Sequence, residues 1–417
     1  MQLQIPPSLH HRPYRLLWFG QIVSIAGSQM QVWAIFWHIR NLTDLPIALG
    51  GVGAARILPI IIFSLVGGAV ADSANRRVLM FITQTVMALS ALALAILTFS
   101  DQIVLWQIYA LTAIQATAGA FDSPARQSLV PNLVPRRDLS NAFSMSSIAM
   151  QTGSIIGPAL SGLVIAYFGQ GYTYLFNAIS YGAVLAALAL MGQVPQQKIP
   201  NNGRRAVSLP AIREGIQFIL THPVILSTML LDFFATFFSS ANTLMPIFAR
   251  DILRVGEVEY GWLSAAQSIG AVTAATILSQ AATIRRQGPL FLGSVVIFGL
   301  ATIAFGMSRS LTAAFVALIF IGAADSVSTI IRNTIRQLQT PDYIRGRMTS
   351  VNQIFFMGGP QLGEIEAGVV AQLFGAPLAV VSGGIGCLVA VGWISQRWPL
   401  LRRYNGDEPI PATVPGD

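Results

Sequence analysis

The chain has 417 residues, of which 53% are apolar and only 10% charged, and its mean hydropathy is +0.62. A soluble domain carries about 25% charged residues, so this composition excludes a water-facing surface over most of the chain. The net charge of +8 comes without any basic run interleaved with aromatic residues, so we expect no nucleic-acid partner. The single cysteine, Cys387, excludes an internal disulfide framework.

Twelve apolar segments follow one another along the chain, each about 19–27 residues long and thus close to the length that crosses a bilayer. The polar residues 1–13 precede the first segment, which is of spanning length, so we expect no cleaved signal peptide. The pattern predicts an all-α integral membrane protein with twelve transmembrane helices in the lipid bilayer. We place them near 14–37, 46–71, 78–100, 103–121, 141–167, 172–191, 224–249, 260–280, 289–307, 311–331, 348–371 and 377–396.

Short stretches of sequence recur about half a chain apart. Arg126-Gln127 recurs 210 residues further on as Arg336-Gln337, and Arg76-Arg77 recurs as Arg285-Arg286. A duplicated set of helices explains the repeat and predicts two pseudo-symmetric six-helix halves. The interface between such halves is where transporters hold their cargo.

A polar stretch separates the two sets of helices. We expect an N-terminal six-helix half at 1–191, a cytoplasmic linker at 192–222, a C-terminal six-helix half at 223–403 and a disordered, proline-rich tail at 404–417. Apolar residues at 212, 216, 219 and 220 have helical spacing, which predicts a short amphipathic helix within the linker, on the inner face of the membrane.

Basic residues set the orientation. With the N-terminus inside, the cytoplasmic segments hold 20 of the 25 lysines and arginines, the outer segments hold four, and Arg56 lies inside the second span. Such an imbalance determines topology, so both termini are predicted to be cytoplasmic.

Two motifs carry a resemblance to a known family. Gly68-x-x-x-Asp72-x-x-x-Arg76-Arg77 lies between the second and third spans, and Gly153-Ser-Ile-Ile-Gly157-Pro158-Ala-Leu-Ser-Gly162 lies in the fifth. With twelve spans in two halves, the chain resembles the major facilitator superfamily. Phe121-Asp-Ser-Pro-Ala-Arg-Gln and Arg345-Gly-Arg-Met-Thr-Ser-Val-Asn are similar to text in its bacterial enterobactin-exporter and macrolide-efflux branch. The resemblance implies a transporter of the cell's inner membrane, which we expect to be a monomer.

The first motif implies a gate. Gly68 allows neighbouring helices to approach closely. Asp72, at a helix end, can accept hydrogen bonds from exposed N–H groups or from a nearby arginine. The resemblance implies that Arg76, Arg77 and Asp122 complete a charge relay, which locks the two halves on the cytoplasmic side. The alternative is that the two arginines only anchor the topology.

The second motif is similar to the antiporter motif of the superfamily. Gly153, Gly157, Pro158 and Gly162 leave a flat, bent helix surface. We expect this surface to pack against a helix of the other half and to seal the transport path. The alternative is the ordinary small-residue packing of any membrane bundle.

Five charged residues fall within the predicted spans: Arg56, Asp232, Asp325, Glu364 and Glu366. An unpaired charge in lipid costs several kcal/mol, so a function is the default hypothesis for each, with a structural ion pair as the alternative. We expect Arg56 to pair with Glu364 or Glu366, only one of which faces it, because residues two apart point to different helix faces. Asp232, which stands alone, is the candidate proton carrier. Asp325 either joins it or pairs with Arg332.

Aromatic and amide side chains predict the wall of a cargo cavity. Trp33 and Phe36 in the first span, and Phe234 and Phe237 in the seventh, suit large amphipathic molecules. The alternative is that half of these rings face lipid. The amides Gln21, Gln29, Gln31, Gln115, Asn177 and Asn242 are further candidates for polar contacts. Gln115 stands four residues before a glycine, where drug antiporters usually hold an arginine. The residue usually linked to proton transfer is therefore missing.

Nothing in the sequence indicates an enzyme. The four histidines have no metal-ligand spacing, and no Ser-His-Asp set, phosphate-binding loop or Cys-x-x-Cys motif is present, so we expect no cofactor and no metal. We expect a secondary active transporter, driven by protons, that exports a siderophore or a hydrophobic, amphipathic drug-like compound by alternating access. The alternatives are a facilitator or importer of a small metabolite or lipid in the same fold, and a non-transporting interaction protein.

Overall fold

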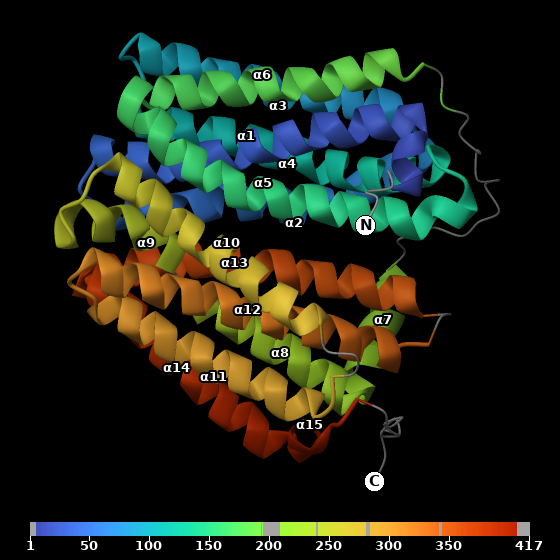
Figure 1. The fold of residues 1–417 in the computed structure, drawn as a ribbon, viewed down its shortest axis with the longest axis vertical. Coiled ribbons are helices and arrows are strands. Elements are labelled where there is room, and N and C mark those ends of the chain that lie inside the picture. Colours follow the sequence, from blue (N-terminus) through green and yellow to red (C-terminus); the bar gives the residue numbers. More distant parts are fainter. Residues whose placement is uncertain are drawn as a thin grey trace. The chain divides into compact units, whose positions relative to one another are not determined.

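The computed structural model describes residues 6–192, 194, 209–238, 241–280, 284–341 and 344–406. All regular elements within these ranges are helical, as Figure 1 shows. The predicted all-α fold is confirmed. Because a bilayer offers no hydrogen-bonding partner, a spanning backbone must satisfy its own N–H and C=O groups, and a helix does so within one segment.

Six long helices account for the first six predicted spans. They are α1 (Arg12–Leu42), α2 (Pro46–Ser73), α3 (Arg76–Phe99), α4 (Leu105–Leu129), α5 (Leu139–Phe168) and α6 (Gln170–Leu190). Short 3-10 turns lie before α1 (η1, Pro7–His10) and between α4 and α5 (η2, Val130–Asn132, and η3, Arg136–Asp138).

The remaining predicted spans are also helical. The seventh contains α8 (Pro223–Phe238), α9 (Ala241–Ile247) and a π-helical turn, η4 (Phe248–Ile252), and residues 239–240 lie outside the described residues. The others are α10 (Glu257–Ser279), α11 (Gln287–Met307), α12 (Leu311–Gln339), α13 (Arg345–Phe374) and α14 (Ala376–Arg397).

Nine helices in the described part of the chain are long and apolar enough to cross a membrane. The other three predicted spans correspond to α1, α4 and α13, which are equally long but more polar. These three helices carry Gln31, Gln115 and Glu364, three of the polar residues that the sequence singles out. The three less hydrophobic helices are thus among those that carry candidate functional residues.

The chain divides into two compact units, each described here by itself. The first unit contains Met1–Thr43 and Ala55–Ala206, and the second contains Asp44–Ala54 and Val207–Asp417. The beginning of α2 therefore groups with the second unit. There Gly50 meets Gly368 of α13, and a Cβ atom added at Gly368 would lie 2.9 Å from the Cα of Gly50.

Within the first unit, α1 packs against α5 and α6, while α3 packs against α4 and α6. The beginning of α1 is held to α5 by two side-chain hydrogen bonds to backbone carbonyls. The hydroxyl of Tyr14 donates to Ala142 O at 2.6 Å, and the indole N–H of Trp18 donates to Met145 O at 2.7 Å.

Within the second unit, α12 packs against α10 and α11, and α8 packs against α13 and α14. The short helix expected in the linker is present as α7 (Leu209–Thr221). Its Phe218 and Ile219 form a buried cluster with Ile344 and Met348 at the start of α13. Residues 193 and 195–208 of the linker lie outside the described residues.

The expected disorder is wrong for Tyr404, the first residue of the predicted tail. A short helix, α15 (Pro399–Arg403), is followed by Tyr404, which is only 2% exposed. The backbone oxygen of Tyr404 accepts from Gly288 N at 2.9 Å, and its hydroxyl accepts from Gln339 Nε2 at 2.9 Å. Burial of the ring and two hydrogen bonds hold the chain here, and residues 407–417 lie outside the described residues.

Candidate functional site

The first motif lies where α2 ends and α3 begins. Asn75 caps α3, its side chain accepting from the backbone N–H groups of Arg77 and Val78. The guanidinium of Arg77 donates to Leu188 O at 2.7 Å and to Ala189 O at 3.3 Å, near the end of α6. A cation is favourable at a helix C-terminus, so Arg77 fastens α3 to α6.

Arg76 is buried, and the side chain of Asp72 lies outside what the structure describes. Gly68 is partly exposed. The tight approach in this region is made by its neighbour Gly67, where an added Cβ would lie 3.0 Å from the carbonyl carbon of Ala120 on α4. The gating role of this motif stays a proposal.

Asp122 is buried on α4. Its Oδ1 accepts from Thr83 Oγ1 and from Gln84 Nε2, both at 2.9 Å, and its Oδ2 lies 3.9 Å from Arg126 Nε. The carboxylate is thus bonded by two α3 side chains and faces a cation one turn along its own helix. Sequence reasoning missed Thr83 and Gln84, and used Arg126 only in the repeat and in the stretch that resembles the efflux branch.

The glycines of α5 face α1. A Cβ added at Gly153 would lie 2.9 Å from Ile25 Cβ, and one at Gly157 would lie 2.8 Å from Ala26 O. Pro158 and Gly162 are buried in the same helix. We expected these glycines to pack against a helix of the other half. That expectation is wrong for Gly153 and Gly157, because α1 already occupies the space beside them.

In the second unit, Asp232 of α8 forms a buried ion pair with Arg332 of α12. Arg332 Nη1 lies 2.5 Å from Asp232 Oδ1, and both residues are 3% exposed. Asp232 is therefore not isolated, and Arg332 has an acid partner other than Asp325. Asp325 lies seven residues earlier on α12 and is exposed. Residues seven apart share a helix face, so Asp325 and Arg332 lie on one side of α12.

A second buried arginine extends the pair. Arg336 donates to the side chains of Asn333 and Asn352 and, through Nε, to Arg332 O at 3.2 Å. The repeat makes this cluster informative, because Arg336 corresponds to Arg126 and Arg332 to Asp122. The repeat therefore has an acid in the first unit, Asp122, where it has a base in the second, Arg332. The acid that pairs with Arg332 is Asp232, which comes from another helix, α8.

The remaining charged residues lie in different units. The guanidinium of Arg56 lies 5.8 Å from the ring centre of Phe36 on α1. Glu364 and Glu366 are partly buried on α13. Glu364 packs against α2 near Gly53, because a Cβ atom added at Gly53 would lie 2.7 Å from the Cβ atom of Glu364. The expected pairing of Arg56 with one of these glutamates stays a prediction.

The aromatic residues of α8 form two stacked rows. Phe233 stacks on Phe237, with 5.9 Å between ring centres, and Phe234 stacks on Phe238 at 6.3 Å. Phe234 also meets Trp393 of α14 edge to face. On α1, Trp33 and Phe36 are buried. The rings pack among helices within each unit, and their cargo role stays a prediction.

A chain of amide side chains crosses the first unit from α6 through α1 to α4. Asn177 Nδ2 donates to Gln31 Oε1 at 2.7 Å, and Gln31 Nε2 donates to Gln115 Oε1 at 2.6 Å. The Gln115 amide in turn reaches Met87 O on α3 at 3.4 Å. Ser180 Oγ donates to Asn177 Oδ1 at 3.0 Å. The sequence indicated the three amides singly, but not that they form one directed chain.

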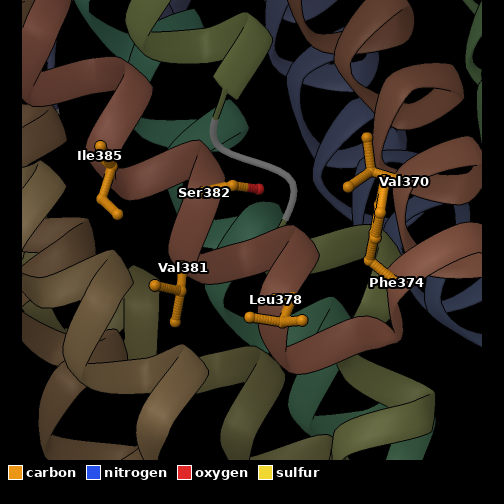
Figure 2. A pocket seen from close by; sticks show the side chains of 6 residues that line it. All are labelled: Val370, Phe374, Leu378, Val381, Ser382 and Ile385. Atoms are coloured by element: carbon orange, nitrogen blue, oxygen red, sulfur yellow. The ribbon is translucent and has the colours of Figure 1, made fainter.

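An apolar groove of about 340 Å³ lies between α13 and α14 (Figure 2). It is lined by Val370, Phe374, Leu378, Val381, Ser382 and Ile385. Its one polar group, the hydroxyl of Ser382, donates to Ala379 O at 3.0 Å. The groove has no charged lining residue and includes none of the residues predicted from the sequence.

Comparison with known proteins identifies the family. The model of the transmembrane secretion effector family of major facilitator transporters matches residues 6–411. The chain belongs to this family. The predicted resemblance to the major facilitator superfamily is confirmed, and the chain is a multi-pass membrane transporter rather than an enzyme.

Relatives match over nearly their full length. The multidrug efflux pump Tap of Mycolicibacterium fortuitum is 26% identical over 94% of this chain and 97% of its own. The staphyloferrin A transporter of Staphylococcus aureus is 26% identical, with 91% and 92% covered. The enterobactin exporter EntS of Citrobacter koseri is 24% identical, with 97% and 96% covered.

Solved structures share the fold. A bacterial homologue of the lysosomal transporter Spinster, in an inward-facing and unoccupied conformation, superposes with a TM-score of 0.71 at 14% identity, covering 96% of this chain and 97% of its own. A POT family transporter in complex with 5-aminolevulinic acid gives 0.73 at 14% identity, covering 94% and 96%. At this identity the likeness shows the fold alone.

Proposed function

We propose that this protein exports a siderophore or an amphipathic, drug-like compound across the cell's inner membrane by alternating access. The observation that carries the proposal is the set of relatives named as a siderophore exporter, a siderophore transporter and a drug efflux pump, each matched over more than nine-tenths of this chain. We propose further that the protein works as a monomer. Both termini lie in the cytoplasm in this proposal, which the distribution of arginine supports.

We propose protons as the coupling ion, with Asp232 as their carrier. The ion pair between Asp232 and Arg332 is buried, so neutralising the acid leaves a buried cation without its partner, which is costly. Arg332 then needs another acceptor, and Asp325 stands on the same face of α12. Protonation of Asp232 thereby favours a different arrangement of α12 relative to α8, which is how a proton can drive a conformational change.

The gate and the cavity complete the proposal. Asp122 with Arg126, together with Arg76 and Asp72 of the first motif, controls opening at the end where α2 meets α3. Arg77 contributes by fastening α3 to α6. The aromatic rows of α8 and Gln115, the partly exposed amide of the first unit, contact the cargo.

Transport in everted membrane vesicles tests the function. Vesicles that contain the protein should accumulate enterobactin, staphyloferrin A or an amphipathic dye when an imposed pH gradient is acid inside, and an uncoupler should abolish accumulation. Vesicles with Asp232→Asn, in which the charge is removed at nearly constant shape, serve as the matched control. Accumulation that ignores both the uncoupler and this substitution would refute proton coupling.

A facilitator or importer in the same fold is the second candidate. It is favoured by Gln115, which stands where drug antiporters usually hold an ionisable arginine. The same vesicles distinguish the two, because a facilitator equilibrates its cargo in both directions and never concentrates it.

A further inference from the structure

Four exposed arginines lie close to the beginning of α11. Arg285 and Arg286 come directly before this helix, and Arg402 and Arg403 end α15. We call these four residues the arginine cluster. Arg285-Arg286 is the second copy of Arg76-Arg77 in the repeat, and neither the proposed gate nor the proposed cavity uses it.

Close backbone packing joins the two segments of the cluster, and α15 lies beside the beginning of α11 in Figure 1. Gly288 of α11 contacts the carbonyl of Leu401 on α15, which leaves no room for a Cβ atom. The N–H of Gly288 also donates to Tyr404 O at 2.9 Å. Each arginine of the cluster is within three residues of Gly288 or Leu401 in the sequence, so its Cα lies at most about 11 Å from this contact. The four side chains therefore extend from one small region of the backbone.

No acidic side chain pairs with the arginine cluster among the described residues. The ion pairs of those residues involve other bases, and none includes an arginine of the cluster. Four positive charges in one region repel one another. An anion bound among them would offset that repulsion, so the cluster favours an anionic partner.

The first unit has a pair of exposed arginines, Arg136 and Arg137, with an acid beside it. Arg137 Nε lies 3.8 Å from Asp138 Oδ2, and the same oxygen lies 2.8 Å from His11 Nε2. These bases already have a carboxylate among them. The arginine cluster has none in the part of the chain that the structure describes, which distinguishes it from an ordinary group of surface bases.

The backbone of Arg286 is in a conformation that suits glycine better than arginine. Its φ is 56°, in the left-handed region where a Cβ atom crowds the following carbonyl oxygen. Arg286 is the N-cap residue of α11, yet its side chain makes no capping hydrogen bond. Glycine would form this turn without strain, so the turn does not explain the arginine, whereas a bound anion does.

Exposed apolar side chains border the arginine cluster. Leu290 is exposed one turn into α11, Leu400 is exposed on α15, and Trp393 is exposed one turn before the end of α14. Trp393 meets Trp398 edge to face, with 5.6 Å between ring centres. Tryptophan is enriched where the headgroups of a bilayer meet its hydrocarbon core. The cluster therefore lies at the membrane surface, at the level of the lipid headgroups.

We propose that the arginine cluster binds the phosphate headgroup of an anionic phospholipid, which belongs to the cytoplasmic leaflet in the proposed topology. Guanidinium groups hold phosphate oxygens through paired N–H donors, and basic residues beside a membrane helix attract anionic lipid. A headgroup bound by both segments connects the beginning of α11 to α15. This site is separate from the proposed gate and cavity and adds a lipid partner to the transporter.

Lipid binding by the full chain in detergent tests the site. Native mass spectrometry gives the dissociation constant of the first bound phosphatidylglycerol, and phosphatidylcholine with the same acyl chains reports binding without net headgroup charge. One basic residue near an anionic membrane surface contributes about fivefold in affinity, so Arg285→Gln with Arg286→Gln should weaken phosphatidylglycerol binding at least about tenfold. Binding of phosphatidylcholine should stay unchanged, which shows that the variant is folded.

A second pair of substitutions tests whether the two segments form one site. Arg402→Gln with Arg403→Gln should weaken phosphatidylglycerol binding to a similar extent. Because one headgroup needs both segments, the four substitutions together should weaken it by less than the product of the two losses. The matched control is Arg136→Gln with Arg137→Gln in the first unit, which should leave the dissociation constant unchanged.

Four results would overturn the site. They are unchanged phosphatidylglycerol binding in both pair variants, equal weakening by the control pair, losses of the two pairs that multiply, and binding of inorganic phosphate as tight as that of the lipid. The last result would mean that the cluster takes a free anion. These measurements use no cargo, so their failure leaves the proposed transport function intact, and a failure of transport leaves the lipid site intact.

Discussion

Several charged side chains in this protein are buried, where an ionised group costs free energy unless it is paired. Asp122 and Asp232 are both buried, yet their surroundings differ. Asp122 accepts two neutral hydrogen bonds and has an arginine one turn away, whereas Asp232 touches the guanidinium of Arg332. The first arrangement tolerates loss of charge better than the second, because a neutral amide still accepts a hydrogen bond while a buried arginine loses its counter-charge.

Asp122→Asn should impair transport while leaving membrane insertion intact. Asparagine can keep both hydrogen bonds through its Oδ1 atom, but it loses the attraction to Arg126 on which the proposed gate relies. Initial rates of dye accumulation in vesicles, normalised to protein content, measure the effect. Asp101→Asn, at an exposed turn where the backbone is left-handed, is the control. A wild-type rate in the Asp122 variant would remove the gating role.

The Asp232 and Arg332 pair should be strongly non-additive. Asp232→Ala or Arg332→Ala alone leaves one buried charge unpaired and should lower stability by about 3–5 kcal/mol. The double variant removes both charges and should recover part of that loss. Thermal unfolding of the four proteins in one detergent completes the double-mutant cycle. Additive losses would mean that the two side chains do not interact in the membrane.

At the scale of helices, close packing depends on residues without side chains. Gly153 and Gly157 let α5 approach α1, and Gly67 lets α2 approach α4. Small residues serve this purpose in membranes, where lipid tails are as apolar as leucine and association relies on close contact. The α5 motif therefore first stabilises the fold of its own unit, and any sealing role comes in addition.

Gly157→Leu should destabilise the first unit. A leucine there has to displace Ala26 and Gln29 of α1, and such overpacking costs about 1–3 kcal/mol or more. We expect a lower melting temperature and a lower yield in detergent. Gly182→Leu, at an open position on α6, should leave both unchanged. A Gly157 variant that melts like the wild type but fails to transport would restore the sealing role as the main one.

The helices themselves were predictable because hydrophobic length is a local property. Each of the twelve apolar runs is helical in the described part of the chain, and α7 followed from the spacing of apolar residues in the linker. Partners were not predictable, because they depend on tertiary packing. Asp232 was expected to stand alone but meets Arg332, which lies 100 residues further along the chain. Gln31, Gln115 and Asn177 were each indicated as polar contacts, yet their shared hydrogen bonds appear only when α1, α4 and α6 assemble.

At the scale of the whole molecule, the end of the described chain is part of the fold. Tyr404 joins the start of α11 to the end of α12 through Gly288 and Gln339, and its ring is buried. An aromatic residue in this position contributes both area and hydrogen bonds. The C-terminal segment thus stabilises helices that are far from it in sequence.

Two variants distinguish the contribution of Tyr404 to stability from that of residues 407–417. Deletion of residues 407–417 should leave the melting temperature unchanged, because the bonds of Tyr404 remain. Tyr404→Ala should lower stability by about 3–5 kcal/mol, the usual cost of replacing a large buried ring by alanine. Scanning fluorimetry in detergent measures both. Equal melting temperatures for Tyr404→Ala and the wild type would show that the ring contributes nothing to stability.

The charge reversal between Asp122 and Arg332 constrains the history of the chain. The repeat predicts a duplication, and under it this position changed sign in one of two copies that began identical. An arginine that arrived at 332 before an acid at 232 would have been buried without a counter-charge and selected against. The order of mutations was therefore not free. The acid at 232 preceded the arginine at 332, and a neutral residue could stand at 332 until then. Ancestral variants that carry Arg332 without Asp232 should be the ones that fold poorly.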